Sequence, residues 1–121
     1  MQNLSFWKWK SWLVLTQIGG LYNFAKVLLS NPGIAPEVFY KKPIQQDEED
    51  PLPLCIHCQI PRSASVQHCA ICGVCMSEQD HHCIFFGKCI AEGNIDNFHA
   101  VICWFVVSTC YFVFLMFADQ L

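Results

Sequence analysis

Basic residues are scarce in this chain and are nowhere clustered. Its 121 residues include 7 lysines and arginines, and the formal net charge is −3. Nucleic-acid binding needs a concentrated positive field, so we expect no nucleic-acid partner. A small-residue cleavage site is also missing after the first apolar run, which ends in Ser30-Asn31-Pro32-Gly33. This absence argues against a cleaved secretory signal.

Charged side chains are missing altogether from residues 98–118, FHAVICWFVVSTCYFVFLMFA. A segment of this length and composition predicts a transmembrane helix. Residues 12–29, WLVLTQIGGLYNFAKVLL, are about as long but are interrupted by polar side chains. Their pattern alone leaves two interpretations open, a spanning helix or an interfacial or buried amphipathic helix. Pro32 and Pro36 end this helix.

Cysteine and histidine, in contrast, are concentrated in one stretch between Cys55 and Cys89. Seven of the 9 cysteines and four of the 5 histidines lie there, in the order C-x2-C-x9-H-C-x2-C-x2-C-x4-D-H-H-C-x5-C. Two thiolates three positions apart can bind one ion, and Zn²⁺ accepts mixed Cys and His ligands in a tetrahedron. C-x2-C pairs interleaved with histidines favour zinc over disulfides. We therefore predict a zinc-binding stretch in a reducing compartment, the cytosol.

The possible ligands outnumber those that zinc needs. Two closed tetrahedral sites use eight ligands, which leaves three over. Adjacent residues such as His81, His82 and Cys83 are not expected to face one ion together. A thiol that stays free beside a histidine and Asp80, held rigid by two metal sites, is the arrangement that makes a cysteine nucleophilic. The full set of possible ligands is Cys55, Cys58, Cys69, Cys72, Cys75, Cys83, Cys89, His57, His68, His81 and His82.

The segment Asp80-His81-His82-Cys83, together with the cysteine spacing around it, resembles the cysteine-rich domain of the DHHC-type protein S-acyltransferases, or palmitoyltransferases. Asn31-Pro32-Gly33 is similar to the family's Asp-Pro-Gly motif, with Asn in place of Asp. Gly93-Asn94 fits the pattern that follows the last ligand. The resemblance covers nearly the whole chain, roughly residues 12–118.

The resemblance implies a role for each candidate site residue. Cys83 would be the nucleophile, His81 the base, and Asp80 the residue that orients and polarises the imidazole of His81. His57 is expected to face solvent, with a role as an alternative ligand left open. One structural zinc ion would be held by Cys55, Cys58, His68 and Cys75, and a second by Cys69, Cys72, His82 and Cys89.

The reaction that the resemblance implies moves a palmitoyl group from palmitoyl-CoA, through an acyl-Cys83 intermediate, to cysteines of protein substrates. Membrane lipids would surround the helices. The resemblance further implies a multi-pass protein of the endoplasmic reticulum or Golgi, with its cysteine-rich domain in the cytosol.

The predicted fold is that of a membrane protein whose transmembrane α-helices flank a small zinc-stabilised cysteine-rich domain of loops and short β-hairpins. The expected segments are an N-terminal interfacial segment (1–11), a transmembrane helix (12–30), a cytosolic linker with the Asn-Pro-Gly motif and an acidic run (31–54), the cysteine-rich zinc domain (55–97), a second transmembrane helix (98–118) and a tail (119–121).

The chain departs from the family pattern in three ways, and the small number of helices favours an alternative function. Ile84-Phe85 stands where the family usually has Pro-Trp, and Ile60-Pro61-Arg62-Ser63 matches only partly. The family typically has four transmembrane helices. Two are visible here, so we expect a fragment, a short isoform or a divergent member. The alternative is a catalytically inactive, zinc-stabilised membrane adaptor or accessory subunit. A membrane RING-type ubiquitin ligase would need a C-x2-C pair after Cys89, which the sequence lacks.

Overall fold

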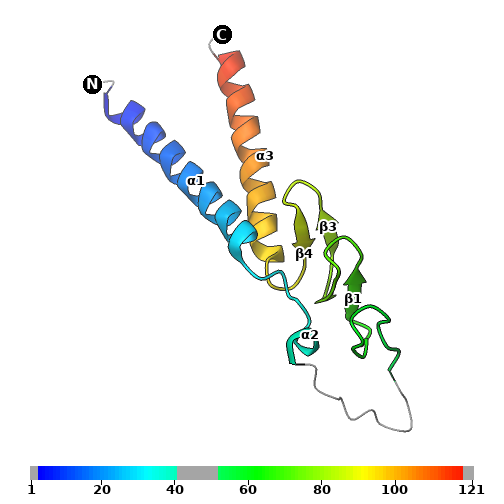
Figure 1. The fold of residues 1–121 in the computed structure, drawn as a ribbon. Helices are drawn as coiled ribbons and strands as arrows, with labels where there is room; N and C mark the ends of the chain where they lie inside the picture. The colour runs from blue at the N-terminus through cyan, green and yellow to red at the C-terminus, as the bar shows by residue number, and fades with distance from the viewer. Residues whose placement is uncertain (1–2, 41–51, 119–121) are drawn as a thin grey trace. The chain divides into compact units, whose positions relative to one another are not determined.

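The structure of the protein, a computed structural model, describes residues 3–40 and 52–118 (Figure 1). Two sequence-based expectations, the acidic run Asp47-Glu48-Glu49-Asp50 and the tail 119–121, lie outside the described residues. The chain divides into two compact units, Met1–Val27 with Asp96–Leu121 and Leu28–Ile95. We describe each unit by itself.

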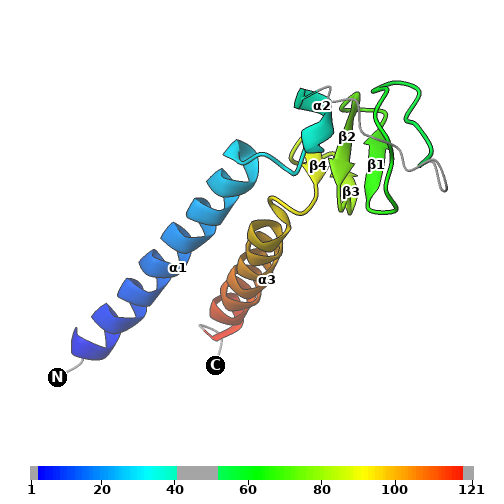
Figure 2. The same cartoon turned by 90° about the horizontal axis from the view of Figure 1, so that it is seen from below.

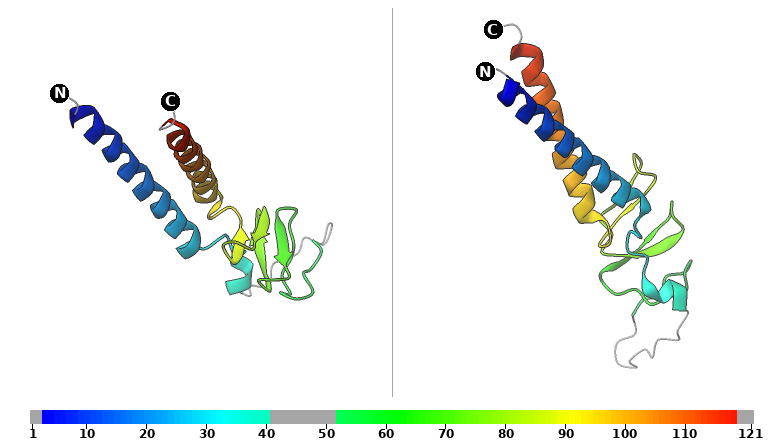
Figure 3. Two further views of the ribbon diagram at one scale, coloured as in Figure 1. Left: turned by 90° about the horizontal axis from the view of Figure 1, so that it is seen from above. Right: turned by 90° about the vertical axis from the view of Figure 1, so that its left-hand side faces the viewer.

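The first unit contains nearly all of two long helices, α1 (Asn3–Leu29) and α3 (Ile95–Ala118), while the last residues of α1 and the first residue of α3 extend into the second unit. Segments Ser11–Leu29 and Ile95–Phe117 are long and apolar enough to cross a membrane, with mean hydropathies of 1.2 and 2.3. Only 11% and 6% of these segments are buried, so their large apolar side chains face outward instead of forming a soluble core. Because the N-terminus of α1 and the C-terminus of α3 lie at the same end, the helices run antiparallel (Figures 1 and 3).

Both helices begin earlier in the chain than hydropathy predicts for the spans. Asn3 lies ahead of the expected start at residue 12, and Ile95 ahead of the expected start at residue 98. The extra turns contain polar residues, which lower hydropathy but do not stop a helix. Before α3, Asn94 and Ile95 both donate their backbone N–H to the carbonyl of Ala91, at 3.0 Å, which starts the helix.

A small residue allows close packing between the two helices. Gly20 of α1 is buried, and a Cβ atom built on it would overlap the indole ring of Trp104 in α3. The neighbouring Gly19 has nothing within 4 Å of the equivalent atom. The helices therefore meet where glycine removes a side chain, as is common between membrane helices.

The second unit is built from short hairpins (Figure 2). The elements of this unit are α2 (Pro36–Tyr40), β1 (Val66–Cys69), β2 (Val74–Ser77), β3 (His81–Cys83) and β4 (Lys88–Ile90). Strand β1 pairs antiparallel with β2, and β3 pairs antiparallel with β4. These hairpins match the predicted architecture of loops and short strands.

Among the residues that the structure describes, the apolar core of this unit is small and contains the cysteines themselves. One cluster joins Cys55 and Cys75 to Ala35, Ile60 and Val66, and another contains Cys69, Met76, Cys89 and Ala91. So few apolar side chains do not stabilise a domain of this size unaided. Bound metal is the usual source of the missing folding free energy.

The Asn-Pro-Gly segment, expected as part of a linker, is integrated into this unit. The Asn31 side chain accepts hydrogen bonds from the N–H groups of Gly33 and Ile34, both at 3.0 Å. Ile34 then forms an antiparallel bridge with Met76 of β2. Gly93 donates to the carbonyl of Pro32 at 3.0 Å, in a contact so close that a Cβ at Gly93 would overlap the Asn31 carbonyl.

Candidate metal centres and nucleophilic cysteine

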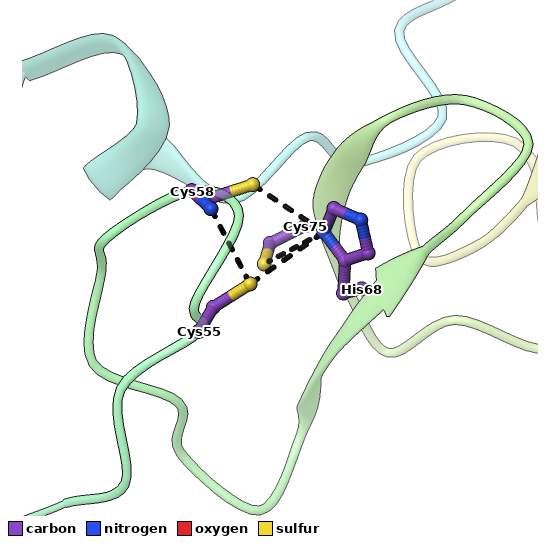
Figure 4. Close-up of side chains that lie close together, drawn as sticks. All are labelled: Cys55, Cys58, His68 and Cys75. Atoms are coloured by element: carbon purple, nitrogen blue, oxygen red, sulfur yellow. Dashed lines mark hydrogen bonds between the residues drawn. The ribbon is translucent and has the colours of Figure 1, made fainter.

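The first candidate metal centre gathers three thiols around one imidazole nitrogen (Figure 4). Nδ1 of His68 lies 3.6 Å from Sγ of Cys55, 3.4 Å from Sγ of Cys58 and 3.8 Å from Sγ of Cys75. A tetrahedral zinc ion with Zn–S bonds of about 2.3 Å and a Zn–N bond of about 2.0 Å places the nitrogen about 3.5 Å from each sulfur. The four side chains therefore have the spacing of a closed zinc site.

The second centre repeats this arrangement with Cys69, Cys72, His82 and Cys89. Nδ1 of His82 lies 3.6, 3.3 and 3.7 Å from the three sulfurs, in chain order. The sulfurs of Cys72 and Cys89 are 3.5 Å apart. In both centres all ligand atoms lie within 4.8 Å of one another. The structure thus brings the eight sequence-predicted ligands together as two groups of four that could hold zinc.

Each centre combines a tight turn with a cross-strand pair. Within the turn, the backbone N–H of Cys58 points at Sγ of Cys55 at 3.5 Å, and that of Cys72 points at Sγ of Cys69 at 3.4 Å. His68 is the antiparallel partner of Cys75, and His82 is the partner of Cys89. Side chains of directly paired residues share one face of a hairpin, so each pair converges on the turn beside it.

The electrostatics of the two clusters favour a bound cation. Burial raises the pKa of Cys75 to about 12, and the neighbouring Cys55 and Cys58 add to the rise. Burial raises the pKa of Cys89 as well. Burial also raises the pKa of Cys69, but N–H donors outweigh it and bring the value to about 7. Buried thiolates at such short separations repel one another, and a divalent cation removes that repulsion.

The alternation of side chains along β3 separates the leftover residues from the metal ligands. In a strand, residues two apart point to the same side. His81 and Cys83 therefore share one side, while His82 points to the other and joins the second cluster. Cys83 belongs to neither group of four and is 6% exposed.

Asp80, His81 and Cys83 form a chain of contacts. Nδ1 of His81 donates to Oδ2 of Asp80 at 2.9 Å, and this bond, followed by one with Cys83, raises the pKa of His81. Burial raises the pKa of Cys83, but the backbone N–H of Phe86, the His81 side chain and the N–H of Phe85 outweigh it, so the net pKa is lowered. This arrangement can move a proton from the thiol to the imidazole.

His57 belongs to neither group of four and is exposed, as expected from the sequence. Its ring stacks on that of His68, with ring centroids 4.7 Å apart and an interplanar angle of 23°. The stacking supports the orientation of His68, which is a candidate ligand, while His57 itself is not one.

Sequence reasoning missed the roles of two residues that fix the site. Lys88, the strand partner of Cys83, donates its ammonium to the carbonyls of Leu28 at 3.0 Å and Ser30 at 2.7 Å. Asn94 is 1% exposed, and its amide donates to the carbonyl of Cys89 at 3.0 Å. Asn94 stands in the recognised Gly93-Asn94 motif, but no signal in the sequence points to Lys88.

Comparisons with known proteins agree with this geometry. A profile of the DHHC palmitoyltransferase family matches residues 48–120, more than half of the 121 residues. A comparison with curated proteins gave no match. The matched segment contains both groups of four ligands and the chain of contacts from Asp80 to Cys83. In the sequence, one apolar helix precedes and one follows the two clusters that could hold zinc, and this protein is a membrane protein that belongs to the DHHC palmitoyltransferase family.

Proposed function

We propose that this chain is a protein S-palmitoyltransferase that carries the palmitoyl group on Cys83. The observation that supports it best is the contact of the Cys83 thiol with His81, whose Nδ1 donates to Asp80 at 2.9 Å. Cys83 stands outside both groups of metal ligands, so its sulfur has a lone pair available for chemistry. A nucleophile, a base and a residue that orients the base are the parts that thiol-based acyl transfer needs.

The first transfer forms a thioester on the protein. His81 takes the proton of the Cys83 thiol, and the thiolate attacks the carbonyl carbon of palmitoyl-CoA. The bond between that carbon and the sulfur of coenzyme A then breaks. The leaving thiolate takes the proton from the His81 imidazolium, which restores the neutral base.

The second transfer runs through the same groups in the opposite direction. A cysteine thiol of a protein substrate gives its proton to His81 and attacks the acyl carbon on Cys83. The Cys83 thiolate leaves and is reprotonated. One thioester replaces another in each step, so the sequence needs no ATP.

The two metal centres have a structural role in this proposal. Cys55, Cys58, His68 and Cys75 would hold one zinc ion, and Cys69, Cys72, His82 and Cys89 the other. Zinc supplies the positive charge that keeps the buried thiolates together and fixes the hairpins. The position of Cys83 then follows from the rigidity of β3, since its neighbour His82 is a ligand.

We further propose the segment division expected from the sequence. Residues 12–30 and 98–118 would cross the membrane, and residues 55–97 would form the zinc domain in the cytosol, at the endoplasmic reticulum or Golgi. The antiparallel course of α1 and α3 supports this division, because the segment joining them then begins and ends on one side of the membrane.

Labelling of the full chain with an alkyne-palmitate probe tests the proposal. We expect one hydroxylamine-sensitive label on Cys83, lost in Cys83→Ser, with two zinc ions retained in both proteins. The matched control is Cys110→Ser, an exposed cysteine in α3, which should keep the label. A wild-type protein that holds two zinc ions but takes no label on Cys83 would favour the inactive membrane adaptor instead.

A further inference from the structure

The two groups of metal ligands form a repeat in the sequence. Each ligand of the second group lies the same number of residues after its counterpart in the first group, and this separation is called the interval below. Each member of the first group recurs at that interval in the second, from Cys55 to Cys69, Cys58 to Cys72, His68 to His82 and Cys75 to Cys89. One further step of the same length takes Cys69 to Cys83 and Cys72 to Phe86. The nucleophile thus stands where a third group would have its first ligand, and a phenylalanine replaces the second.

The backbone follows the same interval. Three pairs of residues that face each other across antiparallel strands are each one interval further along the chain than the pair before. These pairs are Leu54 with Pro61, His68 with Cys75, and His82 with Cys89. Each pair encloses a turn that includes a positive φ, of 56° at Gln59, 70° at Gly73 and 63° at Gly87. The third hairpin is therefore a turn of the same kind as the two that supply metal ligands.

The thiol in each turn also receives the same backbone donors. Cys55 accepts from the N–H groups of Cys58 and His57, and Cys69 from those of Cys72 and Ile71. Cys83 accepts from those of Phe86 and Phe85, again one interval further along the chain. Cys83, the proposed nucleophile, therefore has the same pattern of backbone donors as Cys55 and Cys69, the first ligands of the two metal clusters.

The centres are staggered along the chain. Each takes two cysteines from the turn of one hairpin and a His–Cys pair from the next hairpin. In the part of the chain that the structure describes, no hairpin follows the third turn, because the chain enters α3 at Ile95. The third turn therefore receives no His–Cys pair from a following hairpin, and the Cys83 thiol has His81 as its neighbour.

We propose that Cys83 is the first-ligand position of a third, incomplete metal turn, and that Phe86, at the second-ligand position, keeps the thiol free of metal. This inference deepens the proposed function, which needs an unliganded Cys83. One thiol and one imidazole are too few ligands to retain a soft divalent cation against the closed four-ligand centres. A thiol at position 86 would provide the C-x2-C pair that both other turns use.

The test counts metal ions in the full chain, purified in detergent with zinc or with cobalt(II) as a visible probe. Wild type and the matched control Phe86→Ser should bind two ions. Phe86→Cys should bind a third, seen by native mass spectrometry and as added thiolate-to-cobalt absorption. Iodoacetamide labelling of Cys83 in this variant should fall when zinc is present and return when a chelator takes the third ion.

Two ions in Phe86→Cys, with Cys83 labelled as fast as in wild type, would overturn the inference. If Phe86→Cys retains fewer than two ions, its hairpins are damaged, and Phe86→His is used instead because it offers an imidazole at the same position. A third ion in Phe86→His supports the inference, and two ions overturn it. This test fails separately from that of the proposed function: wild-type Cys83 can take palmitate whether or not the variant binds a third ion, and a third ion can bind in a chain that transfers no palmitate.

Discussion

At the scale of single residues, the candidate chemistry depends on which side of one short strand each side chain occupies. The three adjacent residues His81, His82 and Cys83 cannot all serve one ion, and β3 resolves this by alternation. His82 joins a metal centre, while His81 and Cys83 meet on the other side. The count of candidate ligands predicted two metal sites with three residues left over, and the family resemblance alone divided the ligands into the two groups of four that the structure brings together. The contact of His81 with Cys83 could not be predicted, because it depends on these residues forming a strand. A segment as short as β3 is too short for the sequence to specify a strand.

One prediction at this scale concerns the reactivity of Cys83. Its pKa lies below the ordinary 9.0, and the His81 side chain is one of the groups that lower it. His81→Ala should therefore raise the pKa of Cys83 and reduce its thiolate fraction at neutral pH, about tenfold for each unit of the rise. The rate of iodoacetamide labelling at Cys83, measured across pH, checks this. The two proteins should converge at high pH, where both thiols are ionised.

The control for this experiment is the zinc content, which should stay at two ions in both proteins. His99→Ala is the matched variant. It removes an exposed imidazole of α3 that lies outside both metal clusters, and it should leave the labelling curve of Cys83 unchanged. Identical curves for His81→Ala and wild type would show that His81 does not act on the thiol.

At the scale of secondary-structure elements, hydropathy located both long helices and where they end, but not where they begin. The N-terminal turns of α1 and the first turn of α3 are helical despite polar residues, because helix continuation depends on backbone propensity and capping more than on hydropathy. The bridge between Ile34 and Met76 joins segments that are far apart in the sequence, so no local pattern could reveal it. The same holds for Lys88, whose partners at the end of α1 are recognisable only once the chain has folded.

A pair of adjacent glycines tests the packing of α1 against α3. Gly20→Ala places a methyl group against the ring of Trp104, and overpacking of this kind costs about 1–3 kcal/mol. Gly19→Ala meets nothing within 4 Å, and alanine favours a helix over glycine by about 0.5–1 kcal/mol. We expect thermal unfolding in detergent to occur at a lower temperature in Gly20→Ala, and at an unchanged or higher temperature in Gly19→Ala. Equal effects of the two substitutions would contradict the close approach at Gly20.

At the scale of the whole molecule, a membrane protein of the DHHC palmitoyltransferase family was predictable because its motif is long and its gaps are fixed. The spacing of cysteine and histidine predicts metal sites, and the structure has two clusters there that could hold zinc, between short hairpins. The constant interval between the ligand groups was also readable in the sequence. Its meaning for Cys83 and Phe86 required the strand register, which shows that the third turn has the geometry of the first two.

The central claim is that acyl-Cys83 is an intermediate and not a dead end, and a single-turnover chase tests it most directly. The purified chain is loaded with palmitoyl-CoA, freed of excess donor, and mixed with a cysteine-containing peptide, and the acyl group is followed by mass spectrometry. We predict that palmitate leaves Cys83 and appears on the peptide at the same rate, and that Cys83→Ser gives no acyl-peptide. Palmitate that stays on Cys83 in the presence of the peptide, or a peptide acylated equally well by Cys83→Ser, would contradict the account.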